Sequence, residues 1–376
     1  MQLRRLLALS GEVSGRLRRR SHSTFASPSR PAWAMVVSEP QEEAPELRAT
    51  FRLAEPPRAS QLLVPYDAIR PRGSQGPLCA AAEEATSEDG LLLLRAIVAH
   101  GACACAHATA PNLPASSRPP GQRSVARVVC NPLTGQLLRL PDIDGASSEV
   151  SPGLMGLRRL AHPSRRRRRA ARQTGRWDAM PGFLSPLPAA RPIVVDQPVV
   201  AFGGRLWWID LAWGAVSVDP FADEPDFRFV ELPRGRVLPS SNEMSFERRR
   251  RKKVLSTHRR VGVSEGTLRY VEVSGVEQFV VRSYVLDDDG SSWTMEQSTA
   301  LRAQGAPFPG MPGIACIDPV NADVVYIMVG SGLVLGVDME RGMGFGLSVL
   351  DEPAWPTPCV LPPWLESTRI PSSTGV

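Results

Sequence analysis

Residues 262–266 read Gly-Val-Ser-Glu-Gly, a spacing that in hydrolases places a nucleophilic serine on a sharp turn between a strand and a helix. The surroundings of Ser264 do not suit that chemistry. Gly266 opens the strand-like run TLRYVEV where a helix is required, and the last histidine, His258, precedes the serine. In that fold the acid and the histidine follow the serine along the chain. We therefore interpret residues 262–266 as a turn between strands, and we predict no catalytic residue.

Four side chains that bind metals in other proteins lie close together in HGACACAH, namely His100, Cys103, Cys105 and His107. Structural zinc sites generally use ligand pairs separated by two or more residues and take a second pair from elsewhere. The spacing here, within an alanine-rich tract, favours a loop. We predict neither a metal site nor a cofactor.

Two further patterns contain acidic residues or glycines that could bind ions. Residues 287–290 read Asp-Asp-Asp-Gly, but they lack the alternating ligands and the closing acid of a calcium loop, and Asp-Gly is typical of a hairpin turn. The glycines of RGMGFG, at 342, 344 and 346, lack the strand-loop-helix setting of a phosphate-binding loop. We expect turns at both places.

Aromatic and arginine-rich clusters are the remaining candidates for binding. Trp207, Trp208 and Trp213 form the densest aromatic cluster. Packing in the core is one interpretation, and the other is an interaction surface formed by Trp208 and Trp213 at the rim of the domain. The arginine runs within 158–176 and 247–253 have too little apolar content to pack, so we expect exposed loops there.

The basic charge of the chain is concentrated at its amino-terminal end. The formal net charge is +6, and residues 1–38 hold seven arginines and one acid, Glu12, which accounts for 7 − 1 = +6. The remaining residues are neutral, with 37 bases and 37 acids. A nucleic-acid-binding domain normally carries a basic excess on its folded part. Nucleic acid is therefore not the expected partner, and an RNA contact through the arginine runs is kept as an alternative.

The first 44 residues are predicted to precede the folded domain. Residues 1–38 are rich in arginine and serine and poor in acids, as organelle transit peptides are. The alternative is a disordered extension. The protein is expected in a mitochondrion or chloroplast under the first interpretation, and in the cytoplasm or nucleus under the second.

The elements that must position these residues are mostly short strands. Thirty-six prolines and 31 glycines interrupt the chain every few residues, and strand-sized apolar runs lie between them. The longest apolar run, at 324–337, is shorter than the ~20 residues that a membrane-spanning helix needs, so no membrane association is expected. The six cysteines are scattered, which does not suggest a disulfide framework. The sequence predicts an all-β fold.

Recurring patterns indicate how these strands are arranged. An octet of the form Gly-x-x-x-x-[IV]-[DE]-[LVM] begins at Gly204, Gly266 and Gly332, and strands end in Asn/Asp-Pro at 131–132, 219–220 and 318–319. Repeated strand-turn-strand units bury their apolar faces only against neighbouring units. We therefore predict a β-propeller-like repeat of antiparallel strands over residues 45–370, followed by a tail at 371–376. Two packed β-sandwich-like sheets are the alternative.

Several segments resemble a known family. These are FGGRLWWIDLAWGAVSVDPFADEPDFRFVELP at 202–233, RRVGVSEGTLRYVEV at 259–273 and IDPVNADVVYIMVGSGLVLGVDM at 317–339. They resemble the plant, mostly grass, domain-of-unknown-function 1618 family, and the resemblance extends over most of residues 45–370. The element CNPLTG is also similar to a turn of F-box-associated propellers, although no F-box precedes residue 45. The resemblance implies no catalytic residues, because the family has none assigned.

The predicted function follows from the architecture. A rigid propeller protects its strand edges and presents loops on two faces, so we predict a non-enzymatic scaffold that binds a protein partner. An enzyme that uses polar residues in the central channel is an alternative, which carboxylates with strongly perturbed pKa values in that channel would favour. The sequence does not indicate the oligomeric state.

Overall fold

Short strands separated by turns make up nearly all of the structure, as the sequence predicts. The structure is a computed structural model, and it describes residues 30–42, 44, 46–70, 78–86, 88–99, 123–140, 183–184, 193–222, 226–239, 245–275, 278–301, 308, 310–330, 332–350 and 354–370. Helix in this part of the chain is limited to α2 (Tyr66–Ile69), α3 (Ser245–His258) and the 3-10 turn η5 (Pro363–Glu366).

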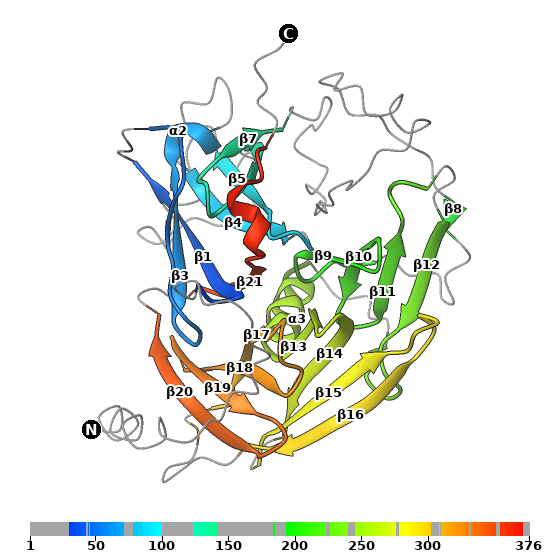
Figure 1. Cartoon of the computed structure of the whole chain (residues 1–376). Coiled ribbons are helices and arrows are strands. Elements are labelled where there is room, and N and C mark those ends of the chain that lie inside the picture. Colours follow the sequence, from blue (N-terminus) through cyan, green and yellow to red (C-terminus); the bar gives the residue numbers. More distant parts are fainter. Residues whose placement is uncertain are drawn as a thin grey trace, which may run out of the picture.

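The described strands form five small sheets arranged in a ring, which confirms the predicted β-propeller (Figure 1). We call each sheet a blade and number the blades along the chain. Blades 2 and 3 are joined into one continuous ladder by a short parallel pairing between β4 and β9. The alternative of two packed sheets is not what the structure shows.

Each blade has one strand next to the ring centre and further strands toward the outside. From the centre outward, blade 1 contains β21 (Thr357–Val360), β1 (Trp33–Gln41), β3 (Ala59–Pro65) and β2 (Thr50–Arg52). Blade 2 contains β4 (Leu78–Thr86), β5 (Leu92–Ala99), β6 (Arg123–Cys130) and β7 (Leu137–Arg139). Blade 3 contains β9 (Val199–Phe202), β10 (Arg205–Asp210), β11 (Gly214–Val218) and β12 (Asp226–Glu231), with β8 (Phe183–Leu184) paired to its outer edge. Blade 4 contains β13 (Arg259–Ser264), β14 (Thr267–Ser274), β15 (Val280–Leu286) and β16 (Trp293–Ala300). Blade 5 contains β17 (Gly313–Ile317), β18 (Val324–Val329), β19 (Leu333–Asp338) and β20 (Met343–Val349).

Blade 1 closes the ring because it combines the two ends of the described chain. Strand β1 pairs antiparallel with β21, with Trp33 opposite Val360 and Val36 opposite Thr357. It also pairs in parallel with β3. The folded domain therefore extends back to Trp33, into the segment that the sequence analysis places ahead of the domain. Residues 1–29, which carry most of the predicted transit peptide, lie outside the described residues.

Two-residue turns connect the first and second strands of blades 3 and 4. The turn between β9 and β10 is Gly203–Gly204, with φ values of 57° and 73°. The turn between β13 and β14 is Glu265–Gly266, with φ values of 48° and 70°. Positive φ at both central residues matches the twist of a two-stranded hairpin, and glycine adopts it at low cost. These turns place the ends of β9 and β13 at the same face of the ring.

The recurring octets occupy equivalent places in only two of the three blades. The octets at Gly204 and Gly266 lead into β10 and β14, the second strands of blades 3 and 4. The octet at Gly332 leads into β19, which is the third strand of blade 5. The octet thus marks a turn followed by a buried strand, and it does not mark a fixed position within a blade.

Apolar side chains pack between neighbouring blades. A cluster that includes Ile209, Leu211, Leu268 and Tyr270 joins blades 3 and 4. A second cluster, with Val271, Ile314 and Ile327, joins blades 4 and 5. The core is therefore divided among the interfaces between blades, as expected when each sheet buries its faces against two neighbours.

Helix α3 replaces a predicted loop. The run 247–253, ERRRRKK, lies in this 14-residue helix, which leads directly into β13. Leu255 is buried against blades 3 and 4, whereas Arg250 and Lys253 are exposed. Arginine and lysine are good helix formers, and one buried leucine anchors the helix to the ring. The prediction of an exposed loop was therefore wrong here, although the basic side chains at 250 and 253 are indeed exposed.

None of the helices in the described ranges combines the length and the apolar composition that crossing a bilayer requires. The arginine run within 158–176 and the HGACACAH tract lie outside the described residues.

Candidate functional site

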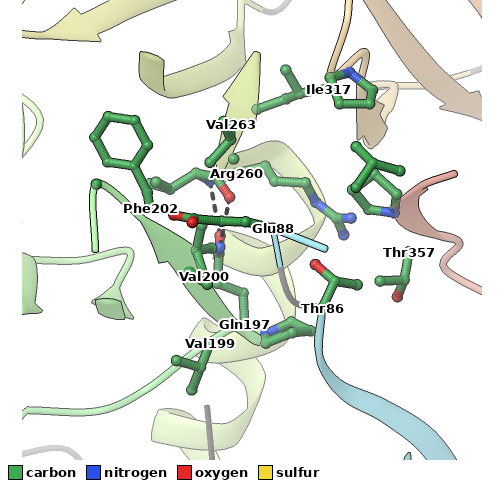
Figure 2. A pocket seen from close by; sticks show the side chains of 18 of the residues that line it. Thr86, Glu88, Gln197, Val199, Val200, Phe202, Arg260, Val263, Ile317 and Thr357 are labelled. Carbon is green, nitrogen blue, oxygen red and sulfur yellow. Dashed lines mark hydrogen bonds between the residues drawn. The ribbon is translucent and has the colours of Figure 1, made fainter. Parts of the chain in front are cut away.

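The innermost strands of all five blades surround a cavity of about 540 Å³ at the centre of the ring. It is lined by Thr86, Glu88, Gln197, Pro198, Val199, Val200, Ala201, Phe202, Gly203, Gly204, Arg260, Val261, Gly262, Val263, Gly266, Ile317, Pro319, Thr357, Pro358 and Val360. Cavities of this size hold small organic molecules in other proteins. We therefore treat the central cavity as the candidate binding site (Figure 2).

The walls of the cavity are mainly apolar because the inner strands are. Val199 and Val200 are consecutive in β9, Val263 lies in β13, and Ile317 is the last residue of β17. Val200 and Val263 are half-buried, whereas Val199 and Ile317 are buried. Gly262 also contributes to the wall. A Cβ built there would lie 3.3 Å from Ile317 Cδ1. A larger side chain at 262 would therefore press against Ile317 and fill part of the space between blades 4 and 5.

One buried amide connects blade 3 to the inner strand of blade 4. Gln197 Nε2 donates to the Val261 carbonyl oxygen at 2.7 Å, and Val261 N–H donates to Gln197 Oε1 at 2.9 Å (Figure 2). Gln197 is 7% exposed. These two bonds pair the N–H and carbonyl groups of Val261 on the inner edge of β13, where no further strand lies. Gln197 therefore has a structural role.

Arg260 is the cationic side chain among the described lining residues. It is partly buried, and its Nη1 donates to the Ala315 carbonyl at 2.9 Å and to the Pro356 carbonyl at 3.4 Å. The side chain therefore reaches from β13 to blades 5 and 1. Its Cζ also lies 5.9 Å from the centre of the Trp355 ring. Loss of hydration lowers the pKa of Arg260 below its usual value, although arginine remains charged at neutral pH.

Two buried carboxyl groups lie near the ring centre without lining the cavity. Burial, together with the neighbouring charge of Asp210, raises the pKa of Asp196 to about 7. Burial likewise raises the pKa of Asp318 to about 6. Asp196 accepts a hydrogen bond from Leu211 N–H at 3.0 Å, and Asp318 accepts one from Val320 N–H at 2.9 Å. Both groups cap backbone turns. They are not the channel carboxylates that would favour an enzyme.

The serine candidate is the last strand residue before a hairpin turn, and the aspartate candidates lie in another hairpin turn. Ser264 is buried at the β13–β14 hairpin, and its hydroxyl donates to the Asp318 carbonyl at 2.5 Å. Asp287 begins the β15–β16 hairpin, where Gly290 N–H donates to the Asp287 carbonyl at 2.8 Å. Gly290 has a φ of 70°, which suits this turn.

Of the three glycines in RGMGFG, only Gly342 lies in a turn. Gly344 and Gly346 belong to β20, so the prediction of a turn was wrong for these two residues. The pairing of β19 with β20 skips Gly346, which has a φ of 56° and forms a bulge.

The predicted interaction surface does not form at Trp213. Trp213 is 2% exposed and packs against Phe229, with ring centres 4.6 Å apart. This side chain therefore belongs to the core of blade 3, and its assignment to an interaction surface was wrong. Trp208 is half-buried and packs against the cluster that joins blades 1 to 3. A side chain fixed in this way offers a partner only part of its ring.

An exposed apolar group does occur where α3 meets the starts of β17 and β21. We call Trp355, Met311 and Val254 the Trp355 patch, and they are 40%, 39% and 51% exposed. A Cβ built on Gly313 would lie 2.5 Å from the Trp355 ring and 2.9 Å from Thr257 Cγ2, so glycine lets the indole and α3 meet at this point. The patch thus joins three segments that are distant in the sequence.

Neither Arg260 nor Trp355 stands out in the sequence as a candidate for binding. Arg260 is one of 42 arginines, and the one feature that distinguishes it in the sequence is its position directly before the apolar run VGV. Trp355 stands alone between prolines, outside the dense aromatic cluster. Their significance depends on contacts between blades, which no local pattern contains. In the described part of the chain, no group of three or more metal-binding side chains is close enough to hold an ion.

Comparison with known proteins finds similarity to one family, whose function is unknown. No curated protein matches the chain. A family model described as "Protein of unknown function (DUF1618)" matches residues 208–326, from β10 to β18. The match is narrower than the resemblance over 45–370, and it contains blade 4 completely. Over residues 208–326 the chain is therefore similar to this family of unknown function, DUF1618.

Proposed function

We propose that this protein is a non-enzymatic interaction scaffold that binds a partner protein through the Trp355 patch. The observation that supports this proposal is that Trp355, Met311 and Val254 are exposed on three segments that meet around Gly313, namely α3 and the starts of two inner strands. Tryptophan and methionine are enriched at protein interfaces, and tryptophan often supplies much of the binding energy. A rigid ring holds such a surface ready, which lowers the entropy cost of association.

The charges around the patch favour a partner segment that is apolar and acidic. Arg250 lies one helical turn before Val254, Lys253 is its neighbour, and both basic side chains are exposed. Positive groups at the rim of an apolar patch attract acidic residues and increase the association rate. We therefore expect a partner segment that places an apolar anchor on Trp355 and acidic side chains near α3.

The test compares two tryptophans of similar exposure. Trp355→Ala removes the centre of the patch. Trp364→Ala removes a residue that is 42% exposed on η5 and serves as the matched control. Each variant and the unmodified protein are used to capture partners from an extract of the source organism. Candidates are then produced in pure form and titrated against all three proteins.

The proposal predicts a partner that binds the unmodified protein and the Trp364→Ala variant equally, and the Trp355→Ala variant at least about tenfold more weakly. Identical binding to both variants, or no partner that binds again in pure form, would refute it.

A second comparison separates a protein partner from RNA. Reversing the charge of Arg250 and Lys253 should reduce the association rate for an acidic protein several-fold and weaken its salt dependence. Binding of RNA that is steeply salt-dependent and unaffected by Trp355→Ala would replace the proposal with the RNA alternative.

A further inference from the structure

The central cavity combines an apolar wall with one partly buried cation. The half-buried side chains of Val200 and Val263 supply apolar surface, and Arg260 supplies the charge. The other charged lining residue among those described is Glu88, which is exposed. Water screens an exposed charge more strongly than a partly buried one. A bound molecule would therefore interact chiefly with Arg260 and with the apolar wall.

The hydrogen bonds of Arg260 leave one edge of its guanidinium available. Both bonds to described residues, to the Ala315 and Pro356 carbonyls, are made by Nη1. Within the part of the chain that the structure describes, Nε and Nη2 have no hydrogen-bond partner and Arg260 has no carboxylate within ion-pair distance. Nε and Nη2 lie on the same edge of the guanidinium, and this pair of donors matches the two oxygens of a carboxylate.

The position of Arg260 carries a desolvation cost that an anion would offset. Burial is the main cause of its lowered pKa, and the opposing influence comes from the Cys316 thiol. Two carbonyl groups stabilise the cation only in part. An anion in the cavity would supply the missing negative charge in an environment where charge-assisted hydrogen bonds are strong.

We propose that the central cavity binds a small organic carboxylate, whose two oxygens pair with Nε and Nη2 of Arg260 while its apolar body contacts Val200 and Val263. Figure 2 shows the Arg260 side chain extending across the cavity toward the side formed by Thr357. A monocarboxylate fits better than a phosphate, because the described lining residues contain one cation and a carboxylate, Glu88. This proposal does not depend on the Trp355 patch.

The first test uses probes that separate the effect of the charge from that of the apolar body. Hexanoate, 4-phenylbutyrate, hexan-1-ol and inorganic phosphate are each titrated into the purified full-length protein by calorimetry, to about 10 mM, which detects millimolar affinity. The proposal predicts saturable binding of both carboxylates at one site. Hexan-1-ol has the same apolar body as hexanoate without its charge, so it should bind at least about tenfold more weakly. Phosphate should not bind.

The second test uses variants of the cavity and one control outside it. Arg260→Gln should weaken hexanoate binding at least about tenfold, which corresponds to about 1.4 kcal/mol. Arg260→Lys keeps the charge without the paired donors, so it should show an intermediate loss. Arg341→Gln removes the same charge from an exposed turn and should leave binding unchanged. Glu88→Gln should bind hexanoate as tightly as the unmodified protein or more tightly.

Thermal unfolding of each variant shows whether it is folded, and the comparison of hexanoate with hexan-1-ol in the unmodified protein needs no variant. Three results would overturn the proposal: no saturable carboxylate binding, equal binding of hexanoate and hexan-1-ol, or a folded Arg260→Gln variant with full affinity.

Discussion

Replacing Trp213 with alanine tests whether this side chain is a core residue or part of a surface. Trp213 is 2% exposed and is among the largest fully buried side chains, and the centre of its ring lies 4.6 Å from that of Phe229. Its backbone bonds, from Trp213 N–H to the Asp210 carbonyl and from Leu232 N–H to the Trp213 carbonyl, would remain after substitution. The effect of Trp213→Ala therefore measures the packing of the indole.

The expected loss is about 4 kcal/mol. A buried aromatic side chain removes roughly 150–250 Å² from water. At ~25 cal/mol per Å², this area corresponds to about 4–6 kcal/mol, an upper estimate because the unfolded chain is partly compact. Measured losses for tryptophan or phenylalanine to alanine in protein cores are about 3–5 kcal/mol.

Urea unfolding followed by far-ultraviolet circular dichroism measures this loss, because tryptophan fluorescence would itself change with the substitution. Trp355→Ala is the control. Its side chain is 40% exposed, so we expect a loss below about 1 kcal/mol. If Trp213→Ala were no more destabilising than Trp355→Ala, Trp213 would not be a core residue and the surface interpretation would return.

Two further predictions concern the buried polar groups beside the cavity. Gln197→Ala should destabilise the protein by about 2–3 kcal/mol, because the N–H and carbonyl groups of Val261 each lose a partner; a loss below about 0.5 kcal/mol in urea unfolding would contradict this role. The pKa of Asp196 is raised from 3.8 to about 7, so the folded state binds more protons than the unfolded state between these values. The contribution of Asp196 to stability is therefore largest below pH 4 and falls as the pH rises toward 7. Asp196→Asn should flatten this part of the stability curve, and an unchanged slope between pH 4 and 7 would show that the carboxyl group ionises normally.

The pattern of strands and turns could be predicted because the necessary information is local. Glu265–Gly266 and Asp287–Gly290 were recognised as turns from their residue types, and the structure places hairpins there. Where a pattern had no local cause, the prediction was less accurate. The octet at Gly332 is similar in sequence to those at Gly204 and Gly266, yet it leads into the third strand of its blade.

Helix α3 and strand β1 show why composition alone misled. Arginine-rich runs are often solvated loops, but the run at 247–253 contains good helix formers, and it is followed by Leu255, which packs against the ring. Trp33–Gln41 follows a basic segment, yet it pairs with the last strand of the propeller. Both outcomes depend on partners that lie far away in the sequence.

The sequence by itself determined that this chain is all-β, that it repeats strand and turn in a propeller-like manner, and that turns follow Ser264 and begin at Asp287. These properties follow from residue preferences within a few positions. Only the tertiary structure decided that Trp213 is buried and Trp355 exposed, and that Arg260 faces a cavity lined by five strands. The physical reason is that burial and the neighbours of a charge are set by contacts between blades, and these contacts join residues tens to hundreds of positions apart.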